Sequence, residues 1–186
     1  MIMVLYEDQL AAGTLPKQYG PHLLVKQCVA DMLGREGYWE VGDVEALPCK
    51  GRDQLLRKLR EGRQYAAASV VAVLDDDKVR DAHAALEGAC KADVVRWLRE
   101  STGCPSPARL RPVLLAENME TLVDAVCTCL GLPIPQAKPR PIDRDELISR
   151  ALARSAAGRT LRQRVRDAVP SFDYLVTKLA DLVAAH

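Results

Sequence analysis

The fold of this chain is decided by residues 70–77, Val-Val-Ala-Val-Leu-Asp-Asp-Asp. Five apolar residues, mostly β-branched, end abruptly in three carboxylates. A short apolar run of this kind predicts a buried strand of a parallel sheet. Ligands of open α/β sheets bind beyond the carboxyl ends of the strands. The acids that end this run therefore predict a functional site at that edge.

Strand and helix patterns alternate along the first two thirds of the chain. The predicted strands are Ile2–Tyr6, Tyr38–Val41, Ser69–Leu74 and Val113–Leu115, and Gly42–Gly51 is predicted to be a loop. The predicted helices are Pro21–Leu33, Arg52–Arg60, Lys78–Leu86, Lys91–Glu100 and a segment from Glu117 to Leu130. This alternation predicts an α/β fold, a mostly parallel sheet of about four strands with crossover helices.

The last third of the chain has the pattern of helices without strands. The segment Gly131–Pro141 contains four prolines and is predicted to be a linker. Helices are expected at Asp143–Ser155, Arg159–Ala168 and Ser171–Ala184. We therefore expect an α/β domain over residues 1–131 and a helical C-terminal extension over residues 132–186, packed on that domain.

Composition excludes several classes of protein. The 186 residues are 48% hydrophobic and 27% charged, which is typical of a globular chain and not of a disordered one. The net charge is +1, so a basic surface for nucleic acid must be local. No apolar run approaches the ~20 residues that a membrane-spanning helix needs, and the acidic start does not resemble a signal peptide.

Cysteine usage favours a reducing compartment. The chain has six cysteines, none in a C-x-x-C spacing, and three histidines, so a zinc site is not expected. A chain of this length with a Leu/Val core does not need disulfides. We expect most of the cysteines to be small buried apolar residues, and the protein to be cytoplasmic.

Carboxylates follow three of the four predicted strands: Glu7, then Asp75 with Asp77, then Glu117 with Glu120. The carboxyl ends of parallel strands lie at one edge, and Asp75 and Asp77 would point the same way in an extended segment. Clustered carboxylates repel one another unless a hard cation such as Mg²⁺ neutralises them. These side chains converge only if the first and third strands are neighbours.

Each acid also has an ordinary structural explanation. Aspartate after a strand is common in turns and helix N-caps. Glutamate in a first helical turn complements the helix dipole. Their coincidence at three strand ends favours a shared metal site.

The acids belong to a wider pattern that resembles the Toprim fold, in which a strand ending in Glu precedes a strand ending in Asp-x-Asp. The resemblance is closest to stand-alone Toprim-like bacterial proteins of uncharacterised function, associated with defence-type loci. The segments that carry it are Leu5-Tyr6-Glu7, Gly51-Arg52-Asp53-Gln54-Leu55, Val73-Leu74-Asp75-Asp76-Asp77, Glu117-Asn118-Met119-Glu120 and Pro170-Ser171-Phe172. The Toprim glycines after Glu and after Asp-x-Asp are replaced here by Asp8 and by Lys78-Val79-Arg80.

The resemblance implies a Mg²⁺-dependent (or Mn²⁺-dependent) nuclease or phosphodiesterase acting on DNA or RNA in a bacterial defence or toxin system. Glu7 would act as general acid/base or metal ligand, and Asp75 and Asp77 would bind Mg²⁺. Glu117 or Glu120 would be an auxiliary ligand.

Two other functions remain open from the sequence. One is a non-catalytic Toprim-like subunit that binds a partner protein from the same locus or a nucleic acid. The other is a receiver-like phosphoacceptor, because Glu7-Asp8 follows the first strand. That fold needs a Lys at the end of a late strand, where this chain has Ala116-Glu117.

The C-terminal segment is locally basic, with nine Lys/Arg against three acids between Lys138 and Arg166. Helical spacing places Arg150 with Arg154, and Arg159 with Arg162 and Arg166, on shared faces. Such a stripe is a candidate phosphate contact, although many charge runs are simply solvated faces.

Overall fold

A computed structural model of the chain describes residues 1–7, 20–62, 67–81, 83–116, 119–133 and 150–185. The chain divides into two compact units. Unit 1 comprises Met1–Leu10 and Val44–Glu117, and unit 2 comprises Ala11–Asp43 and Asn118–His186. The division thus differs from the expected boundary after residue 131, because each unit is assembled from two separate segments.

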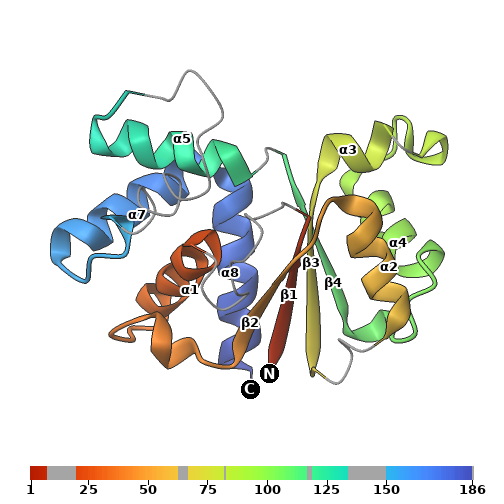
Figure 1. Cartoon of the computed structure of the whole chain (residues 1–186), viewed down its shortest axis with the longest axis horizontal. Helices are drawn as coiled ribbons and strands as arrows, with labels where there is room; N and C mark the ends of the chain where they lie inside the picture. Colours follow the sequence, from red (N-terminus) through yellow and green to blue (C-terminus); the bar gives the residue numbers. More distant parts are fainter. Residues whose placement is uncertain (8–19, 63–66, 82, 117–118, 134–149, 186) are drawn as a thin grey trace. The chain divides into compact units, whose positions relative to one another are not determined.

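Unit 1 contains a sheet of four parallel strands in the order β2-β1-β3-β4 (Figure 1). The strands are β1 (Ile2–Tyr6), β2 (Val44–Pro48), β3 (Ser69–Asp75) and β4 (Leu110–Leu115). This confirms the predicted α/β class with an all-parallel sheet. It also makes β1 and β3 neighbours, which was the condition for their terminal acids to meet.

The second strand was predicted in the wrong place. Tyr38–Val41 forms a short 3₁₀ helix, η2, and strand β2 lies at Val44–Pro48, in the segment expected to be a loop. Buried Val44 and Ala46 alternate with exposed Glu45, which is the period-two pattern of a strand. Pro48 is tolerated because β2 is an edge strand.

Strand β3 is the centre of the unit 1 core. All seven of its residues are buried, and Asp75 at its end pairs in register with Leu115 of β4. Helices α2 (Arg52–Glu61) and α4 (Lys91–Ser101) cover one face of the strands. The packed side chains include Leu55 and Leu59 of α2, Val94 and Leu98 of α4, and Leu5, Ala72 and Leu74 of the strands.

The helix expected at Lys78–Leu86 is two shorter elements. Helix α3 (Asp76–Asp81) begins directly after β3, and the 3₁₀ helix η4 (Ala84–Leu86) follows it. A further 3₁₀ turn, η5 (Pro107–Arg109), leads into β4. The absence of a linker between β3 and α3 fixes where the acids after β3 can point.

Unit 2 is helical. Its elements are α1 (Gly20–Met32), η2, α5 (Met119–Leu130), α7 (Ala156–Ala168) and α8 (Pro170–Ala184). Helix α1 packs on α8, and α5 packs on α7. Most of the helix expected at Asp143–Ser155 lies outside the described residues, although Ser155 is the N-cap of α7 and accepts a hydrogen bond from the N–H of Gly158.

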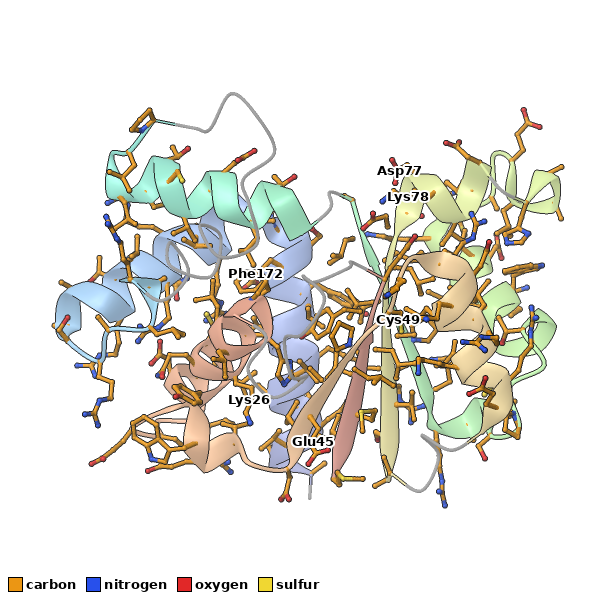
Figure 2. All side chains as sticks on the ribbon, viewed as in Figure 1. Lys26, Glu45, Cys49, Asp77, Lys78 and Phe172 are labelled. Atoms are coloured by element: carbon orange, nitrogen blue, oxygen red, sulfur yellow. The ribbon has the colours of Figure 1, made fainter. Side chains whose placement is uncertain are left out.

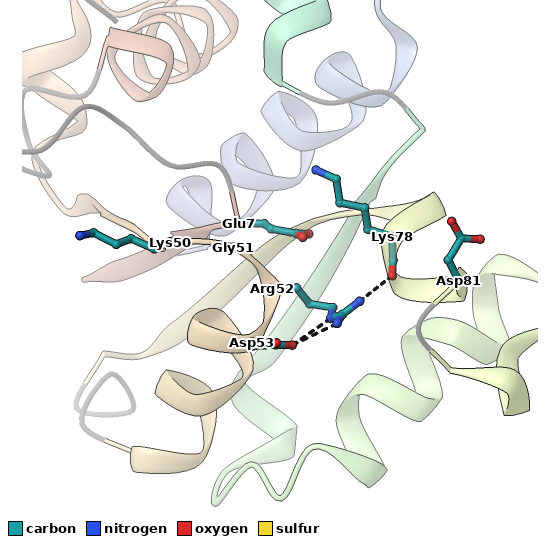
Figure 3. A pocket seen from close by; sticks show the side chains of 7 residues that line it. All are labelled: Glu7, Lys50, Gly51, Arg52, Asp53, Lys78 and Asp81. Carbon is teal, nitrogen blue, oxygen red and sulfur yellow. Dashed lines mark hydrogen bonds and ion pairs between the residues drawn. The ribbon is translucent and has the colours of Figure 1, made fainter.

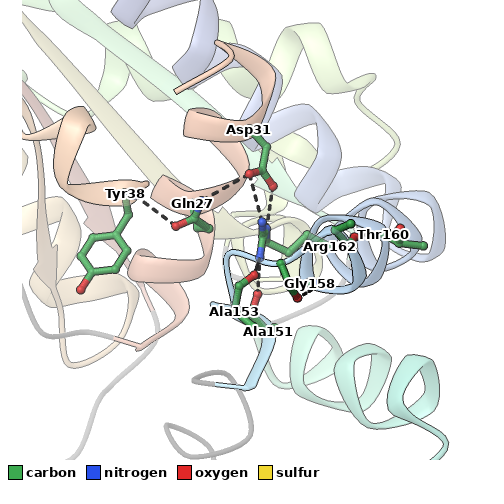
Figure 4. A network of polar contacts seen from close by, with 10 residues as sticks. Gln27, Asp31, Tyr38, Ala151, Ala153, Gly158, Thr160 and Arg162 are labelled. Atoms are coloured by element: carbon green, nitrogen blue, oxygen red, sulfur yellow. Dashed lines mark hydrogen bonds and ion pairs between the residues drawn. The ribbon is translucent and has the colours of Figure 1, made fainter. Parts of the chain in front are cut away.

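A buried ion pair ties α7 to α1 (Figure 4). Arg162 is 1% exposed and binds both carboxylate oxygens of Asp31, from Nε at 2.6 Å and from Nη2 at 3.0 Å. Its Nη1 donates to the carbonyls of Ala151 and Ala153 at 2.7 and 2.8 Å. Gln27 also donates to Asp31, at 3.3 Å. The pair is therefore surrounded by hydrogen bonds on both sides.

The cysteines are free thiols, and four of the six are buried. Burial raises the pKa of the Cys28 thiol to about 12 and that of Cys49 to about 11, so both stay protonated near neutral pH. Among the residues that the structure describes, no helix has the length and apolar character required to cross a membrane.

Candidate functional site

Glu7 and Asp75 meet at the carboxyl edge of the unit 1 sheet. The backbone N–H of Asp75 donates to Oε2 of Glu7 at 2.9 Å, and the N–H of Glu7 donates to the carbonyl of Val73 at 3.0 Å. The two acidic residues are only 6% and 7% exposed. Adjacent parallel strands thus bring together two carboxyl groups that are 68 residues apart in the sequence.

Burial dominates the electrostatics of Glu7. Removal from water raises the pKa of its carboxyl group, and the nearby charge of Asp75 raises it further. The hydrogen bond from the Asp75 N–H and the positive charges of Lys78 and Arg52 act in the opposite direction. Glu7 therefore holds its proton to a higher pH than an exposed glutamate does.

Asp75 is paired with a lysine of the same segment. Nζ of Lys78 lies 2.5 Å from Oδ2 of Asp75, one helical turn further along. This hydrogen bond is the main reason why the pKa of Lys78 is raised. Lys78 thus supplies a permanent positive charge beside the two carboxyl groups.

The side chains of Asp77 and Asp75 do not point the same way from one extended segment, as the sequence predicted. The expectation of an extended segment with both side chains on one side is wrong, because helix α3 begins at Asp76. Asp77 is exposed, and its Oδ1 accepts a hydrogen bond of 2.8 Å from the N–H of Lys78 (Figure 2). Asp76 pairs with Arg80 at 2.9 Å. Aspartates in a first helical turn commonly take this position, since they complement the dipole.

The structure describes the side chains of only some of the expected metal ligands. Glu117 and the side chain of Glu120 lie outside the described residues. Within the described part of the chain, no group of three or more His, Cys, Asp or Glu side chains is placed to hold a metal ion. Of the expected ligands, Glu7 and Asp75 remain as neighbouring carboxylates. Two carboxylates are compatible with Mg²⁺, which usually binds one or two carboxylates together with phosphate and water. They do not fit a cation held by protein ligands only.

A pocket of about 430 Å³ opens beside Glu7 (Figure 3). Its lining consists of Glu7, Lys50, Gly51, Arg52, Asp53, Lys78 and Asp81. Sequence reasoning did not identify the basic members of this set as site residues. Lys78 had a visible signal, since it stands where the Toprim pattern has glycine, whereas Lys50 and Arg52 are ordinary loop and helix charges in the sequence.

Arg52 links the first turn of α2 to the first turn of α3. Its Nη1 donates to the carbonyl of Lys78 at 2.8 Å, and its Nη2 lies 3.1 Å from Oδ1 of Asp53. Gly51 precedes α2 with a φ of 87°, and its N–H donates to the carbonyl of Glu7 at 3.1 Å. The positive end of the α2 dipole therefore lies at the pocket, where it favours an anion.

Two of the α7 arginines, Arg162 and Arg166, are less exposed than their spacing suggested, whereas Arg159 is exposed. Arg159, Arg162 and Arg166 do share a face and line a second pocket, of about 380 Å³, within unit 2. The expectation that Arg162 belongs to an exposed stripe is wrong, because it is buried against Asp31. Arg166 is paired with Asp173, Nε to Oδ1 at 2.6 Å.

The other two arginines of the predicted stripe are exposed. Arg154 lies over the ring of Trp39, 5.0 Å from its centroid, within unit 2. Arg150 lies at the start of the last described segment. A nucleic-acid contact by these residues stays a prediction.

Comparison with known proteins adds no relative to this picture. No family model, no curated protein and no solved structure matches the chain. The function of the site must therefore be inferred from its own chemistry and geometry.

Proposed function

We propose that this protein is a Mg²⁺-dependent, Toprim-like nuclease or phosphodiesterase that acts on DNA or RNA. The observation that carries the proposal is the meeting of two buried acidic residues at the carboxyl edge of the sheet, where the backbone N–H of Asp75 donates to the carboxylate of Glu7 at 2.9 Å. Beside them lies a pocket with three basic residues in its lining. Metal-dependent phosphodiester cleavage uses carboxylates to hold the cation, and basic groups bind the phosphate.

The Toprim-like assignment is supported by where the resembling segments lie. Glu7 directly follows β1, Asp75 ends β3, and Gly51 is the N-cap of α2, so the three residues come from three separate segments. The N–H groups of Asp75 and Gly51 both donate to Glu7, to its side chain and its carbonyl respectively. Three of the five segments that carry the resemblance thus meet at one point of unit 1.

Each polar group at this edge has a defined part in the proposal. Glu7 and Asp75 would hold Mg²⁺, which when bound lowers the pKa of an attacking water and neutralises charge on the phosphate. The alternative role for Glu7, with Asp75 as the ligand of the cation, is that of a general acid/base that would exchange a proton with the water or with the leaving oxygen. Lys50, Arg52 and Lys78 bind and orient the phosphate group.

The test is cleavage of single- and double-stranded DNA and RNA oligonucleotides with Mg²⁺ or Mn²⁺. We expect Glu7→Gln and Asp75→Asn each to lower the cleavage rate by about 100-fold or more, the usual range for a lost proton-transfer group. Asp77→Asn should cause a smaller loss, because Asp77 is exposed and bonded to its own backbone neighbour.

Glu45→Gln is the matched control. Glu45 is an exposed acid near the amino end of β2, at the opposite end of the sheet from Asp77 and Lys78 (Figure 2). Its substitution should leave the rate unchanged. Cleavage that survives both Glu7→Gln and Asp75→Asn would reject the assignment of this site.

A second candidate is a non-catalytic subunit that binds nucleic acid or a partner protein from the same locus. One observation favours it: Asp75 already has a cationic partner in Lys78, 2.5 Å away. This candidate predicts no cleavage under any metal condition. It also predicts oligonucleotide binding that weakens with added salt and with Lys50→Met, because both act on phosphate contacts.

A further inference from the structure

The pairing of Asp75 with Lys78 places a cation on one of the two proposed metal ligands. The side chain of Asp75 is 10% exposed, whereas that of Lys78 is 55% exposed. The carboxylate is thus almost enclosed, and the ammonium group reaches it from the solvent side. Mg²⁺ and the ammonium group would compete for the same oxygen, since two cations at one carboxylate oxygen repel each other.

The backbone of Lys78 is held while its side chain can move. Its carbonyl accepts from Nη1 of Arg52 at 2.8 Å, and its N–H donates to Oδ1 of Asp77 at 2.8 Å. The four-carbon stem is flexible and more than half exposed. The ammonium group can therefore leave Asp75 without any change in α3 or in strand β3.

The pocket offers that ammonium group another partner. Lys78 lines the pocket together with Lys50 and Arg52. A phosphate group bound there would present oxygens that accept charge-assisted hydrogen bonds from Lys78. Such a phosphate also brings further negative charge to the edge, which favours a divalent cation at Glu7 and Asp75.

We infer that Lys78 controls access of Mg²⁺ to Asp75: without phosphate its ammonium group occupies the carboxylate, and a phosphate in the pocket draws it away. This inference rests on the proposed metal site at Glu7 and Asp75. Phosphate and metal then bind with positive coupling, and by linkage each must strengthen the other by the same factor. Lys78 is in this sense a positioning residue that ties metal loading to the presence of substrate.

The test measures Mn²⁺ binding by the loss of the free-ion electron paramagnetic resonance signal, with and without thymidine 5′-monophosphate. Without the nucleotide, Lys78→Met should bind Mn²⁺ about fivefold or more tightly than wild type, the lower end of typical couplings between sites. Saturating nucleotide should tighten Mn²⁺ binding by wild type more than by Lys78→Met, in which only the added negative charge of the phosphate acts.

Two further variants separate the competing ammonium group from the overall charge. Lys50→Met removes a positive charge from the same pocket but leaves the Asp75–Lys78 pair intact, so it should raise Mn²⁺ affinity less than Lys78→Met does. Lys78→Arg keeps the charge and should retain the weak binding of wild type.

The possible failures are distinguishable. If wild type binds Mn²⁺ and Lys78→Met binds it no more tightly, the control by Lys78 is rejected while the proposed metal site stands. Absence of Mn²⁺ binding by every variant, with and without nucleotide, rejects the metal site and the control together.

Discussion

Two of the pairs between an aspartate and a basic side chain of a helix, Asp31–Arg162 in unit 2 and Asp75–Lys78 in unit 1, are built differently. In unit 2, Arg162 is 1% exposed and forms two hydrogen bonds to Asp31 and two to backbone carbonyls. In unit 1, the side chain of Lys78 is 55% exposed, and its ammonium group pairs with Asp75. The same kind of charge pair is thus fixed in one unit and exchangeable in the other.

The chemistry of the two cations explains the difference. A guanidinium group is planar, stays charged and presents several donors in a fixed geometry, so it can satisfy Asp31 and two carbonyls at once. An ammonium group on a flexible stem offers a point charge that any anion can attract. Arginine suits a structural contact, and lysine suits a site where partners change.

Substituting both cations in the same way would test this comparison most strongly. Arg162→Met should lower the free energy of unfolding by about 3–5 kcal/mol, because it leaves the partly buried Asp31 and two carbonyls without their donor. Lys78→Met should lower it by less, about 1–3 kcal/mol, because the nearly enclosed Asp75 loses its donor but water can reach the vacated position of the exposed Lys78 side chain. Urea unfolding followed by circular dichroism measures both.

Arg164→Met is the control for Arg162→Met, since Arg164 is exposed on the same helix, α7. It should have little effect on stability. Equal losses from Arg162→Met and Lys78→Met would show that burial does not distinguish the two pairs.

A smaller effect is expected from filling space beside the Arg162 contacts. A Cβ atom on Gly158 would lie 1.9 Å from the carbonyl oxygen of Ala153, which accepts a hydrogen bond from Arg162. Gly158→Ala should therefore lower the free energy of unfolding by about 1–3 kcal/mol, the range for overpacking. Thermal unfolding of wild type and of Gly158→Ala measures this difference in stability.

The control is Gly42→Ala in the same unit. Gly42 has a φ of −62°, and a Cβ there would meet only the carbonyl of Trp39 at 3.5 Å. This substitution should be neutral or slightly stabilising. A loss of stability at Gly42 as large as that at Gly158 would contradict the packing explanation.

The smallest and most specific effect concerns pH and Glu7. Burial raises the pKa of Glu7 in the folded protein above its ordinary value of 4.5. The folded state thus binds the proton more tightly, so the contribution of Glu7 to stability is fully present below pH 4.5 and is lost as pH rises through the folded pKa. Glu7→Gln, which does not titrate, should therefore gain stability relative to wild type between about pH 4 and pH 7.

Urea unfolding of wild type and of Glu7→Gln at about pH 4 and about pH 7 measures this gain in stability. Glu45→Gln, at an exposed position, should show no comparable pH dependence. A stability difference that shrinks as pH rises would mean that burial does not govern the titration of Glu7.

The sequence predicted the parallel sheet, whereas the meeting of Glu7 and Asp75 depended on β1 and β3 being neighbours, which the strand order shows. A buried apolar run such as Val70–Leu74 has few alternatives, and parallel strands necessarily end at one edge. The position of β2 was missed because Tyr38 and Trp39 suggested a strand by composition, whereas Pro48 suggested a loop. Only the edge position of β2 explains why Pro48 is acceptable there.

The remaining errors concern contacts that no local pattern encodes. The acids after β3 could continue an extended segment or begin a helix. The helix forms at Asp76, because aspartates in a first turn complement the helix dipole. The burial of Arg162 depends on Asp31, 131 residues earlier, so its helical spacing alone resembles that of a solvated arginine. Likewise, Lys50 and Arg52 become pocket residues only through the arrangement of β1, α2 and α3.

The composition of unit 2 from residues 11–43 and 118–186 also has a consequence for how the chain is made. Asp31 is synthesised 131 residues before Arg162, an interval of roughly 10 s at common rates of translation. Strands β2, β3 and β4 of the sheet are synthesised within that interval, after β1. During synthesis, helix α1 is therefore complete before its packing partners α7 and α8 exist, and its apolar side is still uncovered. This nascent helix is the segment that a chaperone would have most reason to bind.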